Sequence, residues 1–296
     1  MVELLIRDIV ELKEMKGIEQ LQREVWKCSD LDVVPSSELL VGKEIGGCLI
    51  GAFDRDRLAG FVFGLLGQDE EGLTIHSNML AVAPAYRGYN LGYRLKLAQR
   101  AAALRRHIRR ITWTFDPMLC LNAHLNFAKL GAIARAYKTN FFGETTASAI
   151  DRTGTDRLWV TWQLDSARVI LRLHQQPPRM NTAETPRALE CTDRLRPRLT
   201  GYEAAFRSPR FVIEIPDGWP ALLADTRLAQ DWRIATRISF TRALDSGYAV
   251  QEFFRPPAGG SHIGEYLLVR NEDASRLQPA LNIDEFPQRD EVLGSE

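Results

Sequence analysis

The chain has 296 residues, 45% of them hydrophobic, and its 38 basic and 38 acidic side chains give a formal net charge of zero. This length exceeds that of a small single domain, so one large domain or two smaller ones are both open. The even charge balance argues against a protein whose main role is to grip nucleic acid or an anionic membrane.

The wide spacing of the cysteines and the charged N-terminus are typical of a protein of a reducing compartment. The N-terminus is already charged at Glu3, Arg7 and Asp8, and no apolar run reaches the roughly 18 residues of a membrane span. We therefore expect a cytoplasmic protein with reduced thiols, no metal and no membrane partner. The four cysteines stand far apart in the sequence, and they are Cys28, Cys48, Cys120 and Cys191.

Apolar periodicity predicts a regular succession of elements in the first half of the chain. Gaps of three and four along Leu12, Met15, Ile18, Leu21 and Val25 indicate one face of a helix. Short β-branched or alternating runs indicate strands. The strand at 73–82, the helix at 91–107 and the strand at 111–115 form a predicted βαβ unit. The other predicted elements are strands at 3–8, 48–53, 58–66, 132–139 and 158–164 and helices at 11–26, 35–44 and 119–130.

The second half divides into an irregular stretch and a compact unit. Residues 175–209 are rich in Pro, Arg, Thr and Glu with little periodicity, which is typical of a linker or surface excursion. A strand, a helix and two strands follow, so we expect a C-terminal β-α-β-β unit. It forms either an independent subdomain or extra strands on the first sheet. The expected division is 1–165, a helix and linker at 166–209, and 210–296 with a frayed tail.

The most informative segment lies where a strand runs into a long helix. An apolar strand ends at Val82, and a turn with Arg87, Gly88 and Gly92 opens directly into the helix. Successive N–H groups of such a turn point at one spot, next to the positive end of the helix, and glycine allows close approach. The pattern predicts a pyrophosphate cradle, although an ordinary β-α connection would share it. The cradle residues are Arg87, Gly88, Tyr89, Asn90, Leu91, Gly92 and Tyr93.

This segment resembles the acyl-CoA signature Gln/Arg-x-x-Gly-x-Gly/Ala of the GNAT superfamily, and the resemblance covers roughly residues 1–164. It implies an α+β fold with a mixed, mostly antiparallel sheet and helices on both faces. It also implies an acyl-CoA cosubstrate whose pantetheine arm lies against Leu80, Ala81 and Val82. Asn90 stands where the family has a glycine. Asparagine tolerates positive φ, so the turn can still form, although its side chain crowds the cradle.

Transfer of an acyl group to an amine needs a group that accepts the amine proton, because amines with pKa values of about 8 to 10 are largely protonated at pH 7. By resemblance, Asn78 stands where many family members have a glutamate; asparagine cannot be a base but can orient a water. His76 shares its strand face by the period-two rule and is a candidate proton acceptor, or a purely structural histidine.

Three further positions complete the predicted site. Asp116 ends the strand 111–115 and could recognise the amine, accept a proton or simply form a turn. Glu144 could pair with an ammonium group or act as a base, and Asn122 could reach the cofactor arm. The tyrosine that the family often uses as a general acid falls on Phe127, so by resemblance that role is empty.

The expected activity is direct transfer of an acyl group, acetyl by default, from acyl-CoA to a primary amine of a small molecule or amino acid. Two alternatives stay open. One is an N-succinyltransferase acting on amino acids, since the many arginines of the C-terminal half could bind a carboxylate. The other is a module that binds or senses acyl-CoA without turnover. A homodimer is compatible with either.

Overall fold

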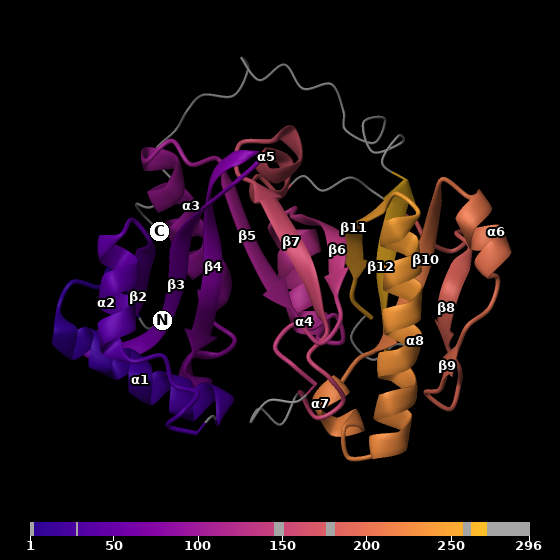
Figure 1. The fold of residues 1–296 in the computed structure, drawn as a ribbon, viewed down its shortest axis with the longest axis horizontal. Coiled ribbons are helices and arrows are strands. Elements are labelled where there is room, and N and C mark those ends of the chain that lie inside the picture. Colours follow the sequence, from indigo (N-terminus) through magenta and orange to yellow (C-terminus); the bar gives the residue numbers. More distant parts are fainter. Residues whose placement is uncertain (1–2, 28, 145–150, 176–180, 257–261, 271–296) are drawn as a thin grey trace.

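The computed structural model describes residues 3–27, 29–144, 151–175, 181–256 and 262–270 (Figure 1). The strands are β1 (Leu5–Asp8), β2 (Cys48–Asp54), β3 (Arg57–Asp69), β4 (Gly72–Val82), β5 (Arg110–Phe115), β6 (Ile133–Lys138), β7 (Arg157–Gln163), β8 (Arg187–Cys191), β9 (Pro197–Arg198), β10 (Arg210–Pro216), β11 (Tyr248–Phe254) and β12 (Ile263–Arg270). The helices are α1 (Leu12–Trp26), α2 (Ser36–Glu44), η1 (Pro84–Tyr86), α3 (Leu91–Arg105), α4 (Cys120–Ala123), the π-helical η2 (His124–Lys129), α5 (Ala167–Leu173), α6 (Tyr202–Arg207), α7 (Trp219–Leu222) and α8 (Thr226–Asp245).

All twelve strands belong to one sheet, in the order β1-β2-β3-β4-β5-β7-β6-β11-β12-β10-β8-β9 (Figure 1). Only the neighbours β4 and β5, and β8 and β10, run parallel; the remaining pairs are antiparallel. The predicted mixed, mostly antiparallel sheet is therefore confirmed. None of the described helices is long and apolar enough to cross a membrane.

Helices cover both faces of the N-terminal strands, as expected. A side chain added at Gly42 of α2 would collide with Phe63 of β3, so that face of β3 packs against α2. A side chain at Gly60 of the same strand would instead meet Leu91 and Leu95, which lie on α3. Because residues 60 and 63 point to opposite faces of a strand, α2 and α3 lie on opposite sides of the sheet.

The parallel strands β4 and β5 are paired over a short distance only. Ile75 pairs with Ile111 and His76 pairs with Thr112, and the pairing of the two strands ends there. Beyond His76, β4 continues to Val82 paired with β3 alone, while β5 continues to Phe115 paired with β7. The two strands thus part after His76, which leaves one edge of β4 without a neighbouring strand.

An irregularity in β4 corrects one step of the sequence reasoning. His76 lies opposite Leu65 and Met79 lies opposite Phe63, so β4 has one residue more than β3 between these pairs. Such an extra residue breaks the alternation of side chains between the two faces. The period-two rule therefore does not place His76 and Asn78 on one face, as the sequence pattern alone suggested.

The C-terminal strands extend the first sheet, since β11 joins β6 through Val250 and Ala134. One hydrophobic core runs beneath both halves, from Phe127 of η2 to Phe240 of α8 and Tyr266 of β12. The stretch 175–209, predicted as irregular, contains β8, β9 and α6, and β8 pairs with β10. Short strands of two to five residues carry too little periodicity to be read from sequence, which explains the missed elements.

Candidate functional site

The turn after β4 has the backbone of an anion cradle. Gly88 has φ of +90° and Asn90 has φ of +56°, so both adopt the left-handed conformation. The expectation that Asn90 tolerates positive φ is confirmed. Within the described part of the chain, the backbone N–H groups of residues 88–93 have no hydrogen-bond acceptor, whereas those of Arg87 and Arg94 do. Six consecutive donors at a helix N-terminus are suited to bind a phosphate group.

Lys129 reaches this turn from a distant part of the chain. Its ammonium nitrogen donates to Asn90 Oδ1 at 2.9 Å and lies 5.8 Å from the centroid of the Tyr93 ring. The Asn90 side chain is therefore held against η2 by Lys129. Lys129 and the exposed Arg87 put two positive charges beside the free N–H groups. Sequence reasoning missed Lys129 as a site residue because its distance from the cradle in the chain hides their proximity.

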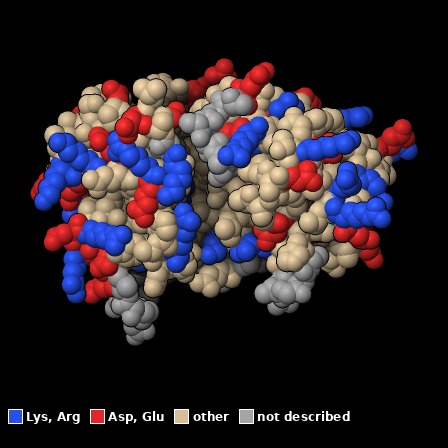
Figure 2. All heavy atoms as spheres, turned by 90° about the horizontal axis from the view of Figure 1, so that it is seen from below, with Lys and Arg blue, Asp and Glu red and all other residues tan. Residues whose placement is uncertain are grey.

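The free edge of β4 leads from the cradle into the molecule. The N–H of Ala83 donates to Ala59 O, so the backbone polar groups of Ala81 and Ala83 point to β3. By the alternation within a strand, those of Leu80 and Val82 point to the side where β5 has parted. Figure 2, which views the molecule from the end at which both strands terminate, shows the surface hollowed between the two halves of the chain, with basic side chains in and beside the hollow.

His76 projects to the sheet face opposite α3, because its neighbour Ser77 contacts α3. Its ring nitrogen Nδ1 lies 3.0 Å from Thr112 Oγ1, and its ring packs on Trp159 at a centroid distance of 5.0 Å. Burial, and secondarily the charge of Lys96, lower the pKa of His76 below 6.5. The imidazole is therefore neutral at pH 7, which is the form that accepts a proton.

Lys96 of α3 is a second polar group at the point where the strands part. It is 4% exposed, and its nitrogen donates to Ser77 Oγ at 2.7 Å. It lies 4.0 Å from the centroid of the Trp113 ring of β5. No helical pattern distinguishes a lysine that turns inward from one on the solvent side, since its stem suits both.

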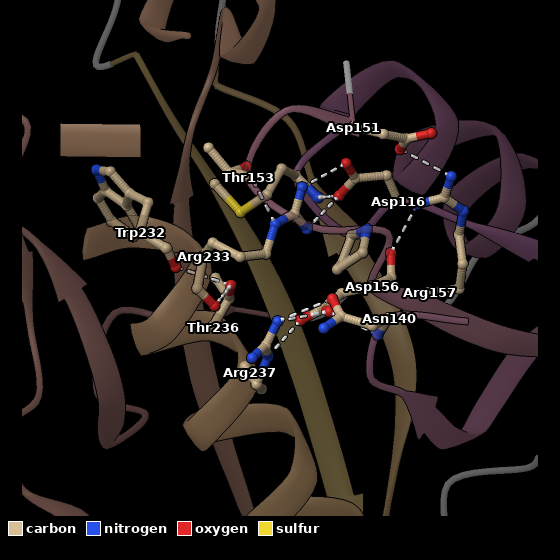
Figure 3. A network of polar contacts seen from close by, with 12 residues as sticks. Asp116, Asn140, Asp151, Thr153, Asp156, Arg157, Trp232, Arg233, Thr236 and Arg237 are labelled. Atoms are coloured by element: carbon tan, nitrogen blue, oxygen red, sulfur yellow. Dashed lines mark hydrogen bonds and ion pairs between the residues drawn. The ribbon is translucent and has the colours of Figure 1, made fainter. Parts of the chain in front are cut away.

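Asp116 forms a buried ion pair that joins β5 to α8. Both carboxylate oxygens accept hydrogen bonds from Arg233 of α8, at 2.9 and 2.7 Å, and Oδ1 also accepts from the N–H of Met118 (Figure 3). Both side chains of the ion pair are buried. Both carboxylate oxygens are thus already engaged by Arg233 and Met118, which is in line with the alternative that Asp116 forms a turn.

The remaining predicted residues lie apart from one another. Glu144 is exposed at the end of the described segment 29–144, and Asn122 is exposed on α4. Phe127 is fully buried between the rings of Phe115 and Tyr266. The hydroxyl of Tyr266 donates to Pro117 O, so this tyrosine does not take over the role that is empty at position 127.

Comparisons with known proteins agree with this geometry. Residues 13–132 match the model of the acetyltransferase (GNAT) family. No curated protein matches the chain. Among solved structures, the ribosomal-protein-S18-alanine N-acetyltransferase of Escherichia coli is 12% identical, with 55% of this chain and 96% of that chain covered and a TM-score of 0.45.

Two further structures are similar over a comparable share of the chain. The yncA protein of Salmonella typhimurium, solved with its cofactor acetyl-CoA, is 16% identical, with 55% and 95% coverage and a TM-score of 0.43. Arabidopsis thaliana Naa50, solved with the bisubstrate analogue CoA-Ac-MVNAL, is 14% identical, with 53% and 97% coverage and a TM-score of 0.42. Residues 13–132, which include β4, the cradle and α3, are therefore identified by the family model as a GNAT acetyltransferase domain.

Proposed function

We propose that the protein transfers an acyl group, acetyl by default, from acyl-CoA to a primary amine of a small molecule or amino acid by direct attack. The observation that carries this proposal is the row of unpaired N–H groups over residues 88–93, at the mouth of the edge that β4 leaves free. The N–H groups would hold the pyrophosphate of the cosubstrate, and the parted strands would take its pantetheine arm. Arg87 and Lys129 would add charge to the phosphate contacts.

His76 is the proposed proton acceptor. It lies at the last pair before β4 and β5 part, on the face opposite α3, and its pKa is lowered, so it is ready to take the amine proton directly or through a water. Thr112 fixes one ring nitrogen and Trp159 packs against the ring, so the other nitrogen is the one left for the acceptor. Asn78, two residues further along β4, is exposed and could orient a water or the substrate.

The activity can be tested by following thiol release from acetyl-CoA and succinyl-CoA with a panel of amino acids and small amines. We expect release with acetyl-CoA for at least one acceptor. Preference for succinyl-CoA would change the acyl group but not the reaction. Tight CoA binding with no release for any acceptor would contradict the proposed turnover and support a binding module.

A cradle variant supplies the control. Arg87→Glu together with Gly92→Asp places two negative charges at the anion site. An added Cβ at Gly92 meets only Leu80, at an ordinary 3.5 Å, and an acidic residue in the first turn stabilises a helix. The variant should therefore fold, as shown by circular dichroism, and lose CoA binding in calorimetry. Unchanged CoA affinity would overturn the cradle assignment.

A further inference from the structure

Lys96 is buried at the point where three elements of the site meet. Its nitrogen donates to Ser77 of β4 and, at 3.3 Å, to Gln99 of α3, and it faces the ring of Trp113 of β5. No aspartate or glutamate of the described residues forms an ion pair with it. Burying an ammonium group without a carboxylate partner costs free energy of folding, so a functional role would account for the position of Lys96.

Ser77 presents an unused proton donor at the same point. Its hydroxyl oxygen accepts from Lys96, but its own O–H donates to none of the described residues. A hydroxyl carries one donor beside its acceptor positions, so this donor is free. Ser77 follows His76, the last residue of β4 that pairs with β5. The free hydroxyl therefore lies at the start of the parted edge.

The parted edge runs from the cradle to this hydroxyl. Ser77 lies five positions before Val82, which corresponds to about 17 Å at roughly 3.3 Å per strand residue. A pantetheine arm that begins at the cradle and follows the edge in extended form would bring its sulfur toward Ser77. The sulfur is the atom that must leave when the thioester is cleaved.

We propose that Lys96 and Ser77 together form the proton donor for this leaving sulfur, in the role that Phe127 cannot fill. This inference rests on the proposed function. The acceptor nitrogen forms a bond to the carbonyl carbon, and the carbon–sulfur bond breaks. The sulfur keeps the electron pair and takes the Ser77 hydroxyl proton, which the Lys96 ammonium group replaces. Lys96 is left neutral and regains a proton from solvent.

The charges around Lys96 suit this role. Burial lowers the pKa of Lys96 to about 7, so it gives up a proton more readily than an ordinary lysine. The neighbouring titratable groups are His76, whose pKa is lowered, and Cys48, whose pKa is raised by burial and whose sulfur accepts from Gln99 at 3.2 Å. Both are therefore uncharged at pH 7.

The test measures the ionisation of the thiol of CoA bound to the protein, which needs no acceptor. A positive charge with a hydrogen-bond donor beside a thiol lowers its pKa. We expect the thiolate fraction of bound CoA, followed by ultraviolet absorbance against pH, to fall about tenfold at a given pH in Lys96→Met. The thiolate fraction of CoA bound to Ser77→Ala should also fall. Arg105→Met, which removes an exposed charge at the end of the same helix, should leave the fraction unchanged.

Calorimetry of CoA binding distinguishes the two levels of the proposal. If CoA binds and its thiol ionises identically in wild type, Lys96→Met and Ser77→Ala, the proton-donor role is overturned while the cofactor site stands. If the wild type does not bind CoA, both the proposed function and this inference fall. Methionine replaces lysine with a flexible apolar side chain and removes a buried charge, so Lys96→Met should fold.

Discussion

His76 shows how a short-range environment decides what one side chain can do. The ring is partly buried between Thr112 and Trp159, and Lys96 acts on it electrostatically from the other side of the strand. Burial and the charge of Lys96 both lower its pKa and favour the neutral imidazole. A neutral histidine beside the point where the strands part is what removal of a proton from an amine requires.

Replacing His76 by alanine should lower kcat/KM by about 10²-fold, the usual contribution of a positioned proton acceptor. In the wild type, kcat/KM should fall as the pH drops below the pKa of His76, which lies under 6.5, because the protonated ring cannot accept a proton. The measurement is the pH profile of thiol release in both proteins. His262→Ala, at an exposed histidine far along the chain, is the control. An unchanged acid limb in His76→Ala would exclude this role.

Asn90 illustrates a local departure from a family pattern that the structure absorbs. Its backbone takes the left-handed conformation that a glycine would take, and its amide oxygen is bound by Lys129. The side chain is thereby held by a hydrogen bond at the edge of the turn. The asparagine at this position therefore brings the positive charge of Lys129 to the turn, and this charge is favourable for phosphate binding.

The helix α8 is tied to the end of β5 by the ion pair of Arg233 and Asp116 (Figure 3). Nearby, Arg237 of the same helix contacts both oxygens of Asp156 and the side chain of Asn140. The hydroxyl of Tyr137 donates to Asp156 as well. These contacts join α8 to β5, β6 and the start of β7, so the second half of the chain supports the strands that carry the site.

Removing one partner of the buried pair should destabilise the protein strongly. Arg233→Met leaves Asp116 buried without its cation, and we expect a loss of roughly 3 to 5 kcal/mol in the free energy of unfolding. The double variant Arg233→Met with Asp116→Asn should recover most of this loss, since no buried charge then remains uncompensated. Urea unfolding of the single and double variants measures both values. Equal stability of Arg233→Met and wild type would show that the pair is not desolvated as described.

The twelve-stranded sheet joins two halves that the sequence divides at about residue 165. The core is continuous across this division, because Phe127 contacts Tyr266 and Tyr137 stacks on Phe240. An edge strand that loses its neighbour exposes unpaired backbone groups and invites aggregation. The division of the chain into separate domains at 165 and 209 remains a prediction.

A fragment ending at residue 165 should therefore aggregate or lack cooperative unfolding, because it exposes β6 and the buried ring of Phe127. The measurement is thermal unfolding of the fragment by circular dichroism beside the full chain, together with its elution in size-exclusion chromatography. A soluble fragment that unfolds cooperatively and binds CoA would show instead that 1–165 is an independent domain.

The order of the elements in the first half, the strand-turn-helix of the cradle and the positive φ of Asn90 were all predictable from the sequence. Each depends on interactions between residues close in the chain: periodicity, turn chemistry and the tolerance of asparagine for the left-handed conformation. The short strand β8 and the extra residue in β4 were not predictable, because pairing with another strand defines them.

The tertiary structure alone decided which partners the charged side chains meet. Lys96 meets Ser77 and Trp113, Lys129 meets Asn90, and Asp116 meets Arg233, each across elements separated in the sequence. The sequence does not distinguish a charged side chain that faces water from one that faces a buried partner. The pKa and the hydrogen bonds of such a side chain depend on the neighbours that packing brings to it. The turn of the cofactor site therefore follows from the local sequence, whereas the proposed proton transfers depend on the fold.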